Sequence, residues 1–268
     1  MSAFAFDRRG FLKAALASAA FLFVAAGCAT RLDVEGFARV PLRVEKFDLF
    51  ALVRQSAATE TLSIYIEGDG APWAAHYPPH DPTPSDPIAL ALAKSDPSPS
   101  LAWVARPCQY LDSTALAGCD SAYWTVRRFA PEVISAYDTA VTQLKNRSGA
   151  RRVRLVGYSG GGVIAVLLAM RRDDVEAVIT VSAPLAVTDW AAWHRSTPLT
   201  GSLDPAREPG RARAPGVHFA GASDKTVPAG IIAAYVKSKG GRLEEIPGFD
   251  HECCWAEVWP RLLKESIQ

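Results

Sequence analysis

A short turn rich in glycine joins two apolar segments near the middle of the chain. Residues 157–161 read Gly-Tyr-Ser-Gly-Gly, and they lie between the strand-like run 153–156 and the helix-like run 163–170. The backbones of a strand and a helix crowd each other where a sharp turn joins them, and glycines relieve this crowding. The pattern therefore predicts that Ser159 stands on a strained turn, where its hydroxyl can act as a nucleophile. Because Gly-x-Ser-x-Gly is common by chance, its chemical partners must decide the interpretation.

A serine nucleophile in this setting needs an acid and a histidine later in the chain. His251 is the last of the five histidines and lies in a loop punctuated by Pro and Gly. Asp224 follows the short apolar run 217–220, and a carboxylate at that strand end can orient and charge-balance the imidazole. We therefore favour Ser159, Asp224 and His251 as a catalytic set. The rival acids are Asp189 and Asp250.

Backbone N–H groups that stabilise an oxyanion are expected near the end of an earlier strand. The apolar run 64–66 ends in Glu-Gly-Asp-Gly. We expect the backbone of Gly68 and Asp69 to supply one donor and Gly160 to supply the other. The alternative is a plain turn that closes a strand, in which Glu67 and Asp69 are solvated loop charges.

With these segments in view, the chain resembles the α/β-hydrolase superfamily, and specifically its small bacterial exported or lipoprotein members. The resemblance covers most of the mature chain and rests on residues 65–70, 106–110, 124, 128–133, the turn at 159, and 250–255. It implies an α/β fold with a mainly parallel central sheet, helices on both faces and short lid-like insertions. It implies the catalytic machinery but no particular substrate. The segment 67–70 departs from the His-Gly-Gly-Gly form of many lipases and esterases.

The first residues have the composition of an export signal. Residues 7–13, Asp-Arg-Arg-Gly-Phe-Leu-Lys, precede an apolar run at 14–26 that is too short to span a membrane but suits a signal-peptide core. The paired arginines resemble a twin-arginine signal, and general secretion is the alternative. The chain is therefore expected to be exported.

Ala-Ala-Gly-Cys at 25–28 resembles a lipobox, in which Cys28 is lipidated and becomes the new N-terminus. An ordinary signal peptide with a chance cysteine is the alternative. By resemblance to lipoprotein sorting, Ala29 suggests delivery to the outer membrane, where acyl chains anchor the protein without spanning the bilayer. We therefore divide the chain into a signal peptide at 1–27, a lipidated tether at 28–40 and an α/β-hydrolase domain at 41–268.

Length and charge agree with one enzyme-sized domain. The part left after residue 27 is typical of a single α/β domain. A net charge of +1 gives no sign of the basic surface that a nucleic-acid-binding protein needs. We interpret Arg207, Arg211 and Arg213 as side chains of a solvated loop. His76 and His80 make a weak metal site, so neither a metal nor a cofactor is expected.

Apolar runs alternate with helical patterns, which is typical of a mainly parallel sheet covered on both faces. Strands are expected at 42–53, 62–66, 101–105, 153–156, 175–181, 217–220 and 243–246. Helices are expected at 87–94, 131–146, 231–239 and 256–264, the first with Asp86 as its cap and Pro87 in its first turn. Segments 77–100 and 185–215 lie where lids or substrate walls grow.

Four tryptophan or leucine side chains are second-tier candidates for lining a substrate pocket. Trp190, Trp193 and Leu199 form either an apolar substrate wall or the packing of the second insertion, with equal weight. Trp73 follows the Gly68–Asp69 segment and either lines the mouth of the site or anchors that loop.

Four cysteines remain after Cys28, and an exported protein meets oxidising conditions, so disulfides are expected. A bridge between Cys108 and Cys119 closes a short loop and would stabilise the fold by about 2–3 kcal/mol. Cys253 and Cys254 can form a vicinal bridge, remain reduced, or exchange partners with the first pair, since four cysteines allow three connectivities. Neither stands on a strand-to-helix turn, so a thiol nucleophile is disfavoured.

These residues predict acyl transfer through an acyl-enzyme. His251 would take the proton of Ser159 as its hydroxyl attacks an acyl carbonyl, and water would then hydrolyse the acyl-enzyme. Small carboxylic esters are the first substrates to expect, and thioesters or amides the next. The alternative from another class is a lipid-anchored protein that keeps the fold without catalysis and acts in envelope binding or maintenance. The oligomeric state stays open.

Overall fold

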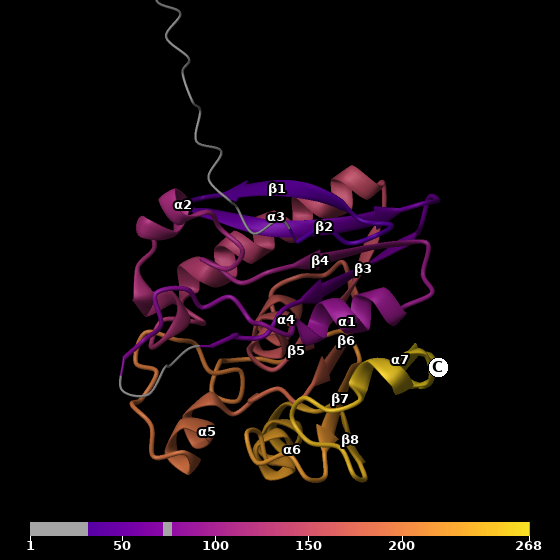
Figure 1. Ribbon diagram of the computed structural model, residues 1–268. Coiled ribbons are helices and arrows are strands. Elements are labelled where there is room, and N and C mark those ends of the chain that lie inside the picture. Colours follow the sequence, from indigo (N-terminus) through magenta and orange to yellow (C-terminus); the bar gives the residue numbers. More distant parts are fainter. Residues whose placement is uncertain (1–31, 72–76, 268) are drawn as a thin grey trace, which may run out of the picture.

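One mixed sheet runs through the molecule, as Figure 1 shows for the computed structural model, which describes residues 32–71 and 77–267. Its eight strands lie in the order β1-β2-β4-β3-β5-β6-β7-β8. The strands are β1 (Ala38–Val44), β2 (Phe47–Gln55), β3 (Thr61–Ile66), β4 (Ser100–Val104), β5 (Arg152–Tyr158), β6 (Val175–Val181), β7 (Gly216–Gly221) and β8 (Arg242–Ile246). Only the pairs β1–β2 and β2–β4 are antiparallel; β3 to β8 all run the same way.

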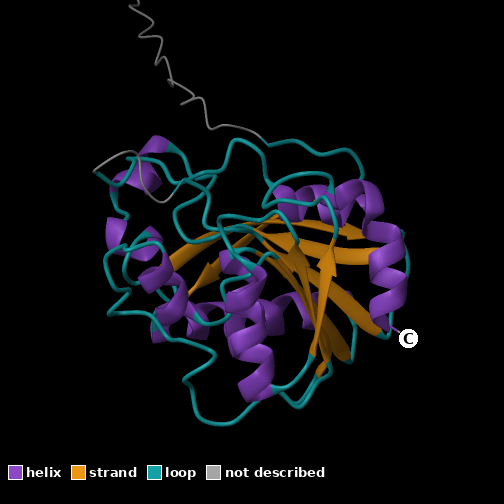
Figure 2. Ribbon diagram, turned by 90° about the horizontal axis from the view of Figure 1, so that it is seen from below, coloured by secondary structure: helices purple, strands orange, loops and turns teal. Residues whose placement is uncertain are grey.

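Helices cover both faces of this sheet (Figure 2). They are α1 (Ile88–Ser95), α2 (Ser113–Ala117), the 3-10 turn η1 (Ser121–Trp124), α3 (Pro131–Ser148), α4 (Gly160–Ala169), α5 (Val187–Trp193), α6 (Ala229–Lys239) and α7 (Trp255–Ile267). The apolar sides of α3, α4 and α6 share one buried cluster with the sheet, and α1 and α7 share the other. The predicted layers, a mainly parallel sheet between helices, are confirmed.

Strand β3 shows how the sequence assigns side chains to the two faces. Leu62, Ile64 and Ile66 belong to the cluster with α3 and α4, and Tyr65 belongs to the cluster with α7. This alternation follows from the two-residue period of a strand. The Tyr65 hydroxyl donates to Asp96 (2.7 Å) and accepts from the indole of Trp259 (2.9 Å), so the polar end of this buried ring is satisfied.

The turn from β5 into α4 depends on the close approach of several backbones. A Cβ at Gly161 would overlap the carbonyl oxygen of Ile66 in the neighbouring strand, and a Cβ at Gly162 would overlap the side chain of Ala183. Only glycine leaves room for α4 to pack this tightly on β3 and β6. These glycines therefore bring the start of α4, and Ser159 before it, to the carboxyl edge of the sheet.

Two details of the predicted elements are wrong. Segment 42–53 is not one strand but parts of β1 and β2, joined at Glu45, whose φ is 54°. A tight turn of this kind usually carries Gly, Asn or Asp, and none is present. Helix α1 begins at Ile88 after Pro87 without a side-chain cap from Asp86; the Glu67 carboxylate accepts from the helix instead.

The insertion between β6 and β7 contains the short helix α5. Asp204, which is buried, accepts hydrogen bonds from the backbone N–H groups of Val187, Thr188 and Ala206 at 2.9–3.2 Å. It also accepts from the Thr188 hydroxyl at 2.7 Å. One carboxylate from later in the chain therefore accepts hydrogen bonds from the first N–H groups of α5. For this reason no local capping residue marks this helix in the sequence.

The N-terminal predictions concern residues that lie outside the described part of the chain. These are the signal peptide at 1–27 and Cys28; the predictions for Trp73 and His76, in the loop after β3, also fall outside the described residues. Strand β1 begins at Ala38, before the expected domain start at residue 41. Among residues 32–71 and 77–267, no helix combines the length and the apolarity that crossing a bilayer requires.

Candidate active site

Ser159 stands between the last residue of β5 and the first residue of α4. Its φ of 48° and ψ of −124° lie in a sparsely populated region of backbone space. A β-carbon in this conformation is strained, and such strain persists only where the surroundings enforce it. The backbone N–H of Ser159 donates to the Val181 carbonyl (2.8 Å) in the adjacent strand, so the turn is held from both sides and keeps the hydroxyl at the edge of the sheet.

The loop after β7 brings a carboxylate to this site, and the loop after β8 brings an imidazole to the hydroxyl. His251 Nε2 lies 3.2 Å from Ser159 Oγ, and His251 Nδ1 lies 2.9 Å from Asp224 Oδ2. The three side chains come from turns that follow parallel strands, whose carboxyl ends share one edge of the sheet. This is the geometry of a nucleophile, a base and an orienting acid.

Asp224 is held so that only one of its oxygens faces the histidine. Its Oδ1 accepts from the backbone N–H groups of Thr226 and Val227, both at 2.8 Å. Burial opposes ionisation of this side chain, but the contact with His251 and the Val227 N–H outweigh it and lower the pKa of Asp224. The carboxylate therefore stays ionised at neutral pH and can stabilise a positive charge on the imidazole.

The two rival acids lie elsewhere. Asp189 makes an exposed ion pair with Arg207 at 3.4 Å. Asp250 accepts from the backbone N–H groups of Glu252 (3.0 Å) and Cys253 (2.7 Å), which closes the turn after His251. Neither carboxylate has a hydrogen bond to the imidazole in the described structure.

The loop after β3 lies beside the start of α4, as the position of a second oxyanion donor requires. The Gly68 N–H is occupied, because it donates to the Glu67 carboxylate at 2.9 Å. The Asp69 N–H has no hydrogen-bond acceptor among residues 32–71 and 77–267. The Gly160 N–H is the first of α4 and so has no partner within the helix. Two N–H groups without an acceptor among the described residues, those of Asp69 and Gly160, therefore lie near Ser159.

A buried ion cluster fixes this loop. The Asp69 carboxylate pairs with Arg106 through one oxygen and with Arg128 through the other, the second at 2.9 Å. Burial alone would raise the pKa of Asp69, but the two guanidinium groups lower it. The carboxylate lies so close to Gly160 that a Cβ there would overlap it. The cluster therefore ties the loop after β3 to the first residue of α4.

Two further buried polar residues support the same loop. The Glu67 carboxylate accepts from Gly68, from Ala89 and Leu90 at the start of α1, and from the Trp103 indole, at 2.9–3.2 Å. Gln109 donates from its amide to the Gly68 carbonyl (3.1 Å). Burial raises the pKa of Glu67, and the donated hydrogen bonds oppose that effect. Glu67 and Asp69 are thus structural carboxylates, not solvated loop charges.

The structure pairs all four cysteines of the described chain. Cys108 bonds to Cys119, which closes the loop that carries Gln109, and Cys253 bonds to Cys254 after His251. Each bridge restrains a loop of the candidate site. None of these sulfurs is therefore a free thiol that could act as a nucleophile.

A cavity of about 400 Å³ opens at Ser159. Its walls include Tyr158, Arg128, Ile88, and Trp190, whose indole donates to the Thr226 carbonyl at 2.7 Å. The other aromatic of the insertion, Trp193, is 62% exposed, and Leu199 lines a separate hollow. The space suits a small ligand, and of the three insertion residues only Trp190 faces it.

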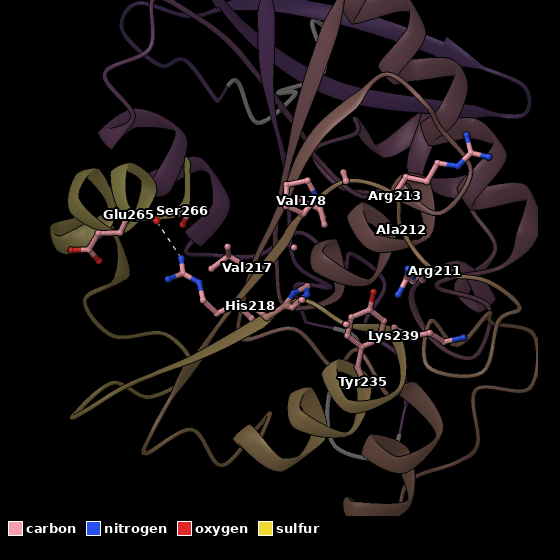
Figure 3. A pocket seen from close by; sticks show the side chains of 16 residues that line it. Val178, Arg211, Ala212, Arg213, Val217, His218, Tyr235, Lys239, Glu265 and Ser266 are labelled. Atoms are coloured by element: carbon pink, nitrogen blue, oxygen red, sulfur yellow. Dashed lines mark hydrogen bonds between the residues drawn. The ribbon is translucent and has the colours of Figure 1, made fainter. Parts of the chain in front are cut away.

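A second cavity, of about 910 Å³, lies at the opposite edge of the sheet, where β7 and β8 begin (Figure 3). Its basic side chains have local roles: Lys239 donates to the carbonyls of Glu208 and Gly210, and Arg242 pairs with Glu244 at 2.7 Å. Lys239 lies in the last turn of α6, where cations complement the helix dipole. This hollow holds no nucleophile paired with a base among its described residues.

The described residues include few side chains that are placed to bind a metal ion. Residues 32–71 and 77–267 contain no group of three or more His, Cys, Asp or Glu side chains arranged to hold one. His80 is exposed, and the three arginines of the loop before β7 are largely solvated, with Arg207 and Arg213 in exposed ion pairs.

The sequence interpretation missed the residues that support the site. Arg106 and Arg128 lie in motifs that carry the family resemblance, but their joint contact with Asp69 depends on the tertiary fold. Arg106 directly follows a buried strand segment, and a charged residue placed there at the carboxyl edge of a parallel sheet was the available signal.

Comparison with known proteins identifies the fold. The sequence matches no protein-family model and no curated protein at a significant level. Among solved structures, the chain is similar to Est1E from Butyrivibrio proteoclasticus (17% identity, TM-score 0.59, covering 85% of this chain and 96% of that one). It is also similar to an alpha-beta serine hydrolase homologue from Coxiella burnetii (14%, 0.58, 88% and 98%) and to the Pyrococcus furiosus esterase Pf2001 (13%, 0.61, 86% and 90%). The chain therefore has the α/β-hydrolase fold.

The ion cluster predicts a large effect of Asp69→Asn on stability. The substitution keeps the shape of the side chain but leaves Arg106 and Arg128 buried without their carboxylate. We expect the free energy of unfolding to fall by about 3 kcal/mol, measured by urea denaturation. Asp189→Asn removes an exposed pair and serves as the matched control, with an expected change within about 0.5 kcal/mol. Equal losses in the two variants would contradict the role of the cluster.

His218 predicts an acid-sensitive contribution to stability. Burial lowers its pKa to about 4, whereas an unfolded histidine titrates near 6.5. Between these values the unfolded chain binds more protons, so this contribution is complete above about pH 6.5 and is lost as the pH falls toward 4. Urea unfolding at pH 7 and pH 4.5 should differ by about 2 kcal/mol less in His218→Gln than in the wild type. Exposed His80→Gln should keep the wild-type difference; an unchanged difference in His218→Gln would refute the assignment.

Proposed function

We propose that the protein is a serine hydrolase that cleaves small carboxylic esters through an acyl-enzyme. The observation that carries this proposal is the chain of contacts from Asp224 through His251 to Ser159, at 2.9 and 3.2 Å. A serine hydroxyl is a weak nucleophile by itself and needs a base within hydrogen-bond reach. The similarity to esterase structures supports the same reaction class.

In the proposed mechanism, His251 Nε2 accepts the Ser159 proton while Oγ forms a bond to the acyl carbon. The carbonyl oxygen becomes an oxyanion, and the N–H groups of Asp69 and Gly160 stabilise its charge. The protonated imidazole then gives its proton to the leaving alkoxide, and the alcohol departs. Water attacks the acyl-enzyme and loses a proton to His251; the imidazolium then returns this proton to Ser159 Oγ as the acyl–oxygen bond breaks, which releases the carboxylic acid and free Ser159. Asp224 orients the imidazole throughout.

The cavity has a size that suits a small ester. About 400 Å³ beside Ser159 accommodates a short acyl group with its alcohol. A further structure of Est1E contains bound ferulic acid, and small carboxylic esters are the substrates that we propose for this chain. Thioesters and amides follow the same chemistry and rank next.

The nucleophile assignment is tested by labelling with a fluorophosphonate. We expect a stoichiometric adduct at Ser159, located by mass spectrometry, and hydrolysis of a short acyl ester that Ser159→Ala lowers by at least about 10⁴-fold. Ser238→Ala changes an exposed serine on α6 that does not line this cavity, so it should label and turn over like the wild type. A folded protein that neither labels nor cleaves the ester would instead support a binding protein with this fold.

We also propose that the protein acts in the cell envelope as a lipid-anchored enzyme. The arginine pair, the short apolar run and Cys28 in residues 1–28 support export and lipidation. The proposed location is the outer membrane facing the periplasm, reached by the twin-arginine or general secretory route. Small acyl esters of that compartment would be its substrates.

The lipid anchor is tested with Cys28→Ser. The wild type, expressed with its own signal in a bacterial host with an outer membrane, should partition into the membrane fraction and carry acyl chains detectable by intact-mass analysis. The serine variant should lose the acyl mass and leave that fraction after processing or remain unprocessed. A wild-type protein found soluble and without added mass would contradict lipidation.

A further inference from the structure

The candidate base lies on a loop that has no regular secondary structure. Residues 250–254 belong to no helix or strand, and Glu252 and Cys253 are exposed. The distance between His251 Nε2 and Ser159 Oγ, 3.2 Å, must nevertheless be kept within narrow limits, because a displacement of about 1 Å can cost about 10²-fold in rate. The loop therefore needs an anchor outside its own backbone.

Side chains provide this anchor at the carbonyl oxygen of His251. The Tyr158 hydroxyl donates to that oxygen at 3.0 Å. The Trp255 indole donates to it at 3.2 Å and also to the carbonyl of Asp250 at 3.2 Å. Both donors are buried. The backbone of the base is thus fixed by one residue of β5 and one of α7.

Tyr158 is itself fixed in position. It ends β5, where its backbone pairs with Val181 of β6. Its ring packs against the imidazole of His251, with centroids 5.3 Å apart, and against Gly68, where a Cβ would lie 2.9 Å from the ring. Burial raises the pKa of the Tyr158 hydroxyl, so it remains a donor across the range in which an esterase works.

We infer that Tyr158 is a positioning residue that sets the distance between the nucleophile and the base. It is the residue immediately before Ser159. The nucleophile follows it in the chain and the carbonyl of the base bonds to its hydroxyl, so both are held by the last residue of β5. The inference rests on the proposed function, since it assigns His251 the role of base. It adds a specific role for the variable residue of the Gly-x-Ser-x-Gly turn.

The test compares two tyrosines that donate to backbone carbonyls. Tyr158→Phe removes only the hydroxyl that bonds to His251. Tyr137→Phe removes a buried hydroxyl that donates to the Ala105 carbonyl at 2.6 Å, away from the histidine loop. We expect similar losses of stability, but a fall in kcat of about tenfold with KM within about twofold only for Tyr158→Phe.

A second measurement reads the position of the imidazole without turnover. The proton between His251 Nδ1 and Asp224 gives a downfield proton NMR resonance, assigned by its loss in Asp224→Asn. We expect this resonance to shift or broaden in Tyr158→Phe and to stay unchanged in Tyr137→Phe. An unchanged resonance together with wild-type kcat in Tyr158→Phe would overturn the inference.

The two proposals fail in distinguishable ways. If the wild type neither labels with the fluorophosphonate nor cleaves esters, the proposed function fails, and the resonance still reports whether Tyr158 holds the imidazole. If the wild type is active and Tyr158→Phe behaves like Tyr137→Phe in both measurements, only the positioning role fails.

Discussion

The contact on which the rest of the molecule depends is the close packing of α4 against the backbone at the end of β3 and against side chains at and just after the end of β6. Gly161 and Gly162 bring the helix so close that it meets the carbonyl of Ile66 and the side chain of Ala183. This approach forces the chain through the strained backbone at Ser159. It also places the first N–H groups of α4 beside the loop after β3. One steric constraint therefore exposes the serine and orients the donors around it.

Ion pairs and hydrogen bonds hold together the loop and the helix that the glycines bring close. Two guanidinium groups from separate segments meet at Asp69, and the neutral donors around Glu67 satisfy a second carboxylate. Buried charges are stable only when such partners are complete. The result is a rigid wall on one side of Ser159, whereas Asp224 and His251 on the other side depend on loops after β7 and β8. The polar groups of the site are thus held by contacts within the protein, which is the preorganisation that the proposed reaction needs.

Local sequence signals were sufficient where one strand or helix decides the outcome. The strand at 175–181 follows its apolar run and is observed with the same bounds, and Ser159, Asp224 and His251 lie at strand ends that the apolar pattern had located. The hairpin at Glu45 was missed because its turn lacks the usual Gly or Asn. The cap of α1 was missed because its acceptor, Glu67, is far away in sequence. Such long-range polar contacts leave no periodic trace in a sequence.

The insertion that carries α5 is organised by Asp204 and touches the cavity chiefly through Trp190. Asp224, in contrast, is oriented by the backbone of its own turn. Helix α5 nevertheless contacts that turn, because the indole of Trp190 and the ring of His194 both bond to the Thr226 carbonyl at 2.7 Å. A change in the length or shape of the insertion would therefore also act on the turn that holds Asp224, so the wall of the cavity and the candidate acid do not vary independently.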